Sequence, residues 1–156
     1  MTTPAPSTPA PSTPAPSTPA PSISTLGIPT LSTPAPSSPT PGVQLVRDLV
    51  DRVHGFRGAY DAHVFSQGHV RPHVFFWDVV QDTVRSYLGQ EGCAVDWRRT
   101  LDFLEEQSRR GAVGVDEVIV TSFLGDLPHP CEPGHGIVAE LGPVMSARFL
   151  RLRPGG

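Results

Sequence analysis

Apolar and polar residues recur with the period of an α-helix most clearly between residues 72 and 88, which read PHVFFWDVVQDTVRSYL. One side of this segment is apolar and is formed by Phe76, Val80, Thr83, Val84 and Tyr87, with Trp77 and Leu88 beside them and Phe75 and Val79 on the far flank. The opposite side is polar and is formed by Asp78, Gln81, Asp82, Arg85 and Ser86. A buried strand rarely exceeds about eight residues, so the length of the segment favours a helix.

The wide apolar side predicts that this helix lies at the centre of the fold and contacts several neighbours. Pro72 suits the first helical turn, and Gly89 suits the position just past the end of the helix. We expect the helix to bury four large side chains, those of Phe76, Trp77, Val80 and Leu88.

Four further segments share the helical period. They are a first helix marked by Val46, Leu49, Val50, Val53 and Phe56, a short helix over Ala59–Val64, a helix over Trp97–Arg110 that begins at the N-cap Asp96, and a helix marked by Val115, Val118, Ile119, Phe123 and Leu127. After a loop over residues 128–136, a last segment from Ile137 to Leu152 is expected to restart or kink at Gly142-Pro143. The pattern therefore predicts an all-α fold, a single compact bundle of five to six helices.

Composition changes abruptly near residue 42. Residues 1–42 contain thirteen of the nineteen prolines, carry no charged residue, and repeat Thr-Pro-Ala-Pro-Ser from Thr3 onward. Such a segment cannot bury enough apolar surface to offset its ordering entropy, which predicts a disordered, low-complexity tail. The sequence then predicts a helical domain over residues 43–153 and a frayed terminus over residues 154–156. A shorter product that starts at Val43 or Val46 is the alternative interpretation of the tail.

Charge and hydropathy exclude several classes of protein. The fifteen acidic and twelve basic residues give a formal net charge of −3, so there is no basic surface of the kind that binds nucleic acid. No apolar run reaches the length of a membrane span, and the first residues lack the features of a secretory signal. We therefore expect a cytoplasmic protein with no membrane partner, in which Cys93 and Cys131 are free thiols.

Two groups of residues carry candidate chemistry. His129, Cys131 and His135 place two imidazoles and a thiol within seven residues, and a loop there could bend them around zinc. A fourth ligand would have to be Glu132, His63 or Cys93, because no closely spaced cysteine pair supplies one.

The second group is a possible polar binding cluster made of His63, His73 and Asp78. His73 and Asp78 are five residues apart on the predicted central helix, so they point to nearly opposite sides and cannot both face one substrate. A general acid/base role for this group is therefore disfavoured, and no cofactor is expected.

The stretch Pro72-His73-Val74-Phe75-Phe76-Trp77-Asp78 resembles a family of small, all-helical bacterial domains of unknown function. Similar stretches are Tyr60–His63, Leu101–Glu106, Ser122–Leu127 and Leu141–Pro143, and together they span most of residues 43–152. That family usually has a small residue at the position of Trp77 and a residue other than glycine at that of Gly125. The resemblance implies an all-helical domain with no established activity, and some domains of this type are similar to antitoxin or immunity proteins.

Two functional hypotheses follow. The sequence favours a non-enzymatic module that binds a protein partner, as an immunity-type or regulatory protein does. The alternative is a small metal-dependent or acid/base enzyme that uses His129, Cys131 and His135.

Overall fold

The computed structural model describes residues 1–2, 9–10, 12 and 38–154. The chain divides into two units, Met1–Pro36 and Ser37–Gly156, and the second holds every helix reported below. Most of residues 1–42, for which disorder is expected, lie outside the described residues, and the last two, Pro41 and Gly42, belong to the first helix.

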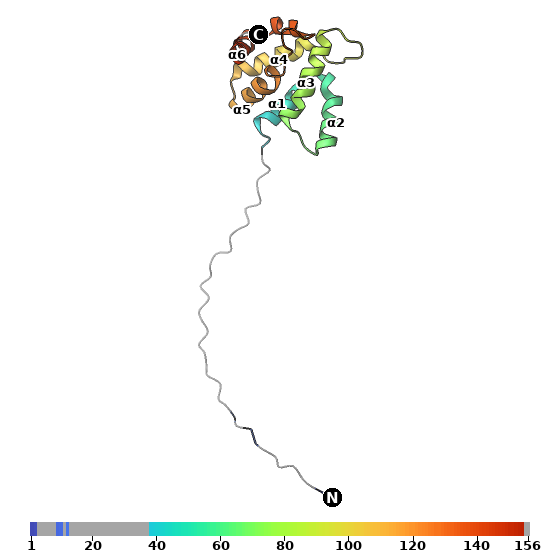
Figure 1. The fold of residues 1–156 in the computed structure, drawn as a ribbon, viewed down its shortest axis with the longest axis vertical. Coiled ribbons are helices and arrows are strands. Elements are labelled where there is room, and N and C mark those ends of the chain that lie inside the picture. The colour runs from blue at the N-terminus through green and yellow to red at the C-terminus, as the bar shows by residue number, and fades with distance from the viewer. Residues whose placement is uncertain (3–8, 11, 13–37, 155–156) are drawn as a thin grey trace. The chain divides into compact units, whose positions relative to one another are not determined.

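The second unit is a bundle of helices, and the described residues contain no strand (Figure 1). Its α-helices are α1 (Pro41–Arg52), α2 (Arg57–Gln67), α3 (Pro72–Tyr87), α4 (Trp97–Arg110), α5 (Val113–Val118) and α6 (Pro143–Leu152). Three short helices join them, namely η1 (His54–Phe56), the π-helix η2 (Ile119–Leu124) and the 3-10 helix η3 (His135–Glu140). The predicted all-α bundle is confirmed.

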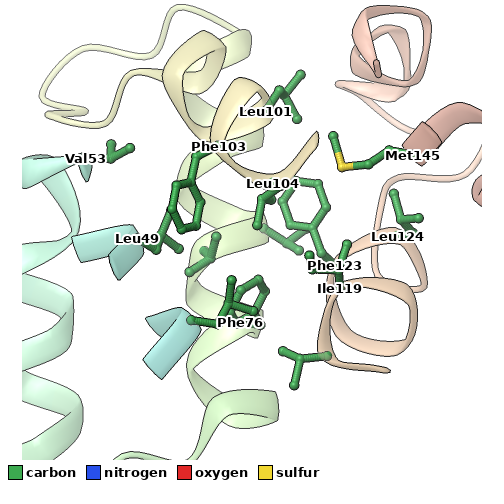
Figure 2. Packing of buried hydrophobic residues seen from close by; sticks show 14 of the residues in the cluster. Leu49, Val53, Phe76, Leu101, Phe103, Leu104, Ile119, Phe123, Leu124 and Met145 are labelled. Atoms are coloured by element: carbon green, nitrogen blue, oxygen red, sulfur yellow. The ribbon is translucent and has the colours of Figure 1, made fainter. Parts of the chain in front are cut away.

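Helix α3 is the central helix of the bundle, as its apolar side predicts. It contacts α1, α2, α4, α5 and η2, and its inward face buries Phe75, Phe76, Val79, Val80 and Thr83. Figure 2 shows side chains from α1, α3, α4, η2 and α6, Phe76 of α3 among them, meeting in one cluster. Each fully buried side chain of this size contributes about 2 kcal/mol before the entropy of ordering it.

The predicted burial of Trp77 and Leu88 is wrong, because both side chains are exposed. Viewed along the helix axis, the buried side chains of α3 point in a mean direction that lies between those of Phe75 and Phe76. Trp77 points roughly a third of a turn away from this direction. Trp77 faces the side on which α2 packs, and α2 presents side chains there that are too short to cover an indole.

The helix ends follow the local chemistry of the sequence. The Asp96 side chain accepts hydrogen bonds from the backbone N–H groups of Arg98 and Arg99, so the predicted N-cap of α4 is confirmed. The last segment restarts at Gly142-Pro143, as predicted, with Pro143 as the first residue of α6. Gly55 allows η1 to approach the segment before α4, where any Cβ would overlap the Ala94 carbonyl.

Among the described residues, no helix is both long and apolar enough to cross a membrane.

Candidate functional site

A groove of about 680 Å³ lies between α2 and α3. Its walls are two helix faces, each built from positions that recur every three or four residues. The α2 wall is formed by Ala59, Ala62, His63, Ser66 and Gln67, and the α3 wall by Val74, Trp77, Asp78, Gln81, Asp82 and Arg85.

The groove exists because three of the five residues of the α2 wall have small side chains. Ala59, Ala62 and Ser66 are too short to fill the space beside α3. Helix α2 buries only one of its own residues, His63, whereas α1 and α3 each bury five. Helix α2 is therefore held against the bundle by few buried contacts, and its side chains do not fill the space between α2 and α3.

Two apolar side chains of α3 line the groove without being covered. Trp77 is 54 % exposed and Val74 is 49 % exposed. A half-exposed indole is unusual for a monomeric surface because tryptophan buries more apolar area than any other side chain when it finds a partner. The part of the groove formed by Val74 and Trp77 is thus an apolar surface that the described residues leave half exposed.

The rest of the α3 wall is charged. Asp78 and Asp82 are one helical turn apart, and Arg85 forms an ion pair with Asp82, with 3.5 Å between Nη1 and Oδ1. Burial raises the pKa of the Asp82 carboxyl, the Arg85 guanidinium opposes this rise, and the neighbouring Asp78 charge adds to it. No ion pair of the described residues includes Asp78.

His63 lies at the base of the groove and is only 6 % exposed. Its Nε2 accepts a hydrogen bond of 3.1 Å from the Arg71 backbone N–H, and its ring packs edge-on against Phe75. Because Nε2 is the acceptor, the ring proton lies on Nδ1, which makes no hydrogen bond in the described part of the chain. The ring therefore ties the α2–α3 loop to α2 and leaves one N–H donor free.

The structure brings two members of the predicted polar cluster together and leaves the third apart. His63 and Asp78 both line the groove, whereas His73 faces η2, where its Nδ1 lies 2.7 Å from the Ser122 hydroxyl. The five-residue spacing between His73 and Asp78 separates them around α3, as expected. His73 joins α3 to η2 and takes no part in the groove.

Of the predicted metal ligands, His129 and Cys131 lie in the loop before η3, and His135 is the first residue of η3. The Nδ1 atom of His135 lies 2.9 Å from the Pro128 carbonyl oxygen, and the His129 backbone N–H donates to the Glu132 carboxylate. Cys131 is exposed. Within the described residues, no three side chains of His, Cys, Asp or Glu are placed to hold a metal ion.

The pattern of apolar residues did not predict the groove, although its residues carry a signal. Ala59, Ala62 and Ser66 place short side chains on one face of α2, and small residues at helical spacing mark a face where another chain segment approaches closely. The apolar character of Trp77 predicts burial, but its position at the edge of the apolar side of α3 leaves it exposed.

No family model, curated protein or solved structure matches this chain. The resemblance to helical domains of unknown function stays a prediction, and the functional conclusion rests on the geometry of the α2–α3 groove.

Proposed function

We propose that the protein is a non-enzymatic binding module that holds a segment of a partner protein in the α2–α3 groove. The observation that carries this proposal is the half-exposed pair Trp77 and Val74, which lines a groove that no side chain of the described residues fills. Tryptophan is enriched among the residues that dominate binding energy at protein interfaces.

The shape of the groove supports a protein segment as its occupant. One face of α2 and one face of α3 form an open groove rather than an enclosed cavity. A peptide helix can lay its apolar face into a groove of this kind. Ala59 and Ala62 in the α2 wall are short and apolar, and they leave room beside Trp77 for a side chain from outside. A regulatory or immunity-type protein works in this way, by occupying a surface of its target.

The groove does not support acid/base chemistry by the predicted cluster. His63 uses Nε2 to accept a backbone N–H, and His73 lies on the η2 side of α3. A general base needs a free acceptor within reach of the proton that it removes. The enzyme that uses His129, Cys131 and His135 has no geometric support from the described residues.

We also place the protein in the cytoplasm as part of this proposal. The free thiols of Cys93 and Cys131 support this placement, because cysteines stay reduced there.

Site-specific photo-crosslinking in the producing cells tests the binding module. A photoreactive amino acid replaces Val74 in the groove or, as the control, Val113, which is 84 % exposed at the start of α5. We expect one discrete crosslinked species from position 74 and none from position 113. Equal crosslinking at both positions, or none at either, would contradict the proposal. In a separate measurement, one equivalent of zinc in the purified protein would favour the metal-dependent enzyme instead.

A further inference from the structure

The side chains that line the groove also indicate what the partner presents to it, if the proposed binding function is correct. We propose that the occupant inserts an arginine whose guanidinium pairs with Asp78 and stacks on the Trp77 ring, while its methylene stem lies along Ala59, Ala62 and Val74. The partner is therefore a protein segment with a basic residue among apolar ones.

The first argument is an acidic charge without a partner. Asp78 and Asp82 lie at positions i and i+4 of α3, where like charges destabilise a helix. Arg85 pairs with Asp82, but in the described part of the chain no cation pairs with Asp78. An incoming cation beside Asp78 relieves this repulsion and neutralises the carboxylate that has no partner within the described residues.

The second argument compares the two tryptophans of the chain. The Trp97 ring has its own cation, since the Arg98 guanidinium carbon lies 4.2 Å from the ring centroid. The described residues place no cation over Trp77, although it is the more exposed ring. Indole is the best aromatic acceptor for a cation, and the open ring adjoins the unpaired carboxylate.

The third argument concerns the shape of the cationic side chain. Lysine and arginine both combine an apolar stem with a charged head, which matches a groove that is apolar at Ala59, Ala62 and Val74 and acidic at Asp78. Arginine fits better than lysine, because a planar guanidinium stacks on an aromatic ring and donates two parallel hydrogen bonds to one carboxylate. We therefore expect arginine to be preferred over lysine.

Nuclear magnetic resonance on the full chain tests this inference, because its two tryptophans give two indole N–H signals. The probes are three helical alanine-based peptides that carry leucine at fixed positions and differ at one site, which is arginine, lysine or glutamine. We expect the arginine peptide to shift the Trp77 signal and not the Trp97 signal, to bind roughly tenfold more tightly than the glutamine peptide, and to weaken as salt is raised.

Matched variants assign the effect to the proposed contacts. Asp78→Asn should reduce the affinity for the arginine peptide to that of the glutamine peptide. Asp61→Asn is the control and should leave the affinity unchanged, because this substitution removes the same charge from α2 at a position outside the groove. Equal affinity for all three peptides would overturn cation recognition and leave the binding module standing. If no peptide shifts the Trp77 signal, this inference is also overturned. The crosslinking experiment at position 74 tests the proposed binding function separately.

Discussion

The junction of α4 with α6 and the groove between α2 and α3 both place carboxylates at a helix contact, with opposite outcomes. At the junction, Glu105 is 6 % exposed, and its two oxygens accept hydrogen bonds of 3.0 Å from the backbone N–H groups of Val144 and Met145. Arg109 adds an ion pair at 3.3 Å. In the groove, Asp78 is only partly buried and pairs with no cation of the described residues.

The difference shows that a carboxylate at a helix contact can either bond to groups within the fold or stay available to a binding partner. Helix α6 has no side-chain cap of its own, so its first N–H groups take their acceptor from α4. The carboxylate of Glu105 is thereby fully engaged and fixes where α6 begins. In the groove, Asp82 pairs with Arg85, whereas Asp78 pairs with no cation of the described residues, which leaves the Asp78 charge available to a partner.

Replacing Glu105 should produce the largest effect. Glu105→Ala removes the acceptor for two N–H groups at the start of α6 and should lower the free energy of unfolding by about 3 kcal/mol. The matched control is Glu106→Ala, since Glu106 forms only an exposed pair with Arg110, worth about 0.5 kcal/mol or less. Urea unfolding measures both, and equal losses would show that Glu105 does not organise the junction.

The same junction can be disturbed from its other side. A Cβ at Gly142 would overlap the Glu105 carboxylate, which can move away only by giving up its hydrogen bonds. Gly142→Ala should therefore destabilise the protein by about 1–3 kcal/mol. Gly58→Ala, in α2 with open space around it, should instead stabilise it by about 0.5–1 kcal/mol, as judged by thermal unfolding.

The groove should tolerate the loss of its largest side chain. Trp77→Ala removes a ring that is half in water and fills no space in the core, so we expect a loss of about 1 kcal/mol or less. Chemical denaturation provides the value. A loss as large as that of Glu105→Ala would place Trp77 among the structural residues and remove the contrast between the two regions.

The smallest expected effect concerns Asp82 and depends on pH. Because burial raises its pKa above the ordinary value of 3.8, the folded state holds this proton more tightly than the unfolded state. Stability is therefore lost as pH rises from 3.8 through the raised folded pKa, and Asp82→Asn, which carries no charge, should gain about 0.3 kcal/mol at neutral pH. The gain should fade as pH falls toward 3.8, whereas a gain that persists in acid would have another cause.

The fold was largely predictable from residue periodicity, and the groove was not. Asp96 and the Gly142-Pro143 restart are local signals, because the chemistry of a helix end lies within a few residues of that end. The α3 segment was predictable as a central helix because Phe76, Val79 and Val80 repeat with its period.

The groove depends on which face of α3 meets α2, and periodicity on one helix does not reveal this. Trp77 has the same apolar character as its neighbour Phe76, yet one is exposed and the other fully buried, because the residues opposite Trp77 are small. Glu105 also pairs with Arg109, four residues along the same helix, and a pair at this spacing is a local signal. Its bonds to Val144 and Met145 join residues about forty positions apart, which no local pattern indicates.

Titration of the partner captured at position 74 against the full chain and two variants tests the central claim most directly. We expect Trp77→Ala to bind that partner at least tenfold more weakly than the original chain while melting at nearly the same temperature, and Val113→Ala to bind with unchanged affinity. Undiminished affinity of the Trp77→Ala chain would contradict the assignment of the α2–α3 groove as the binding surface.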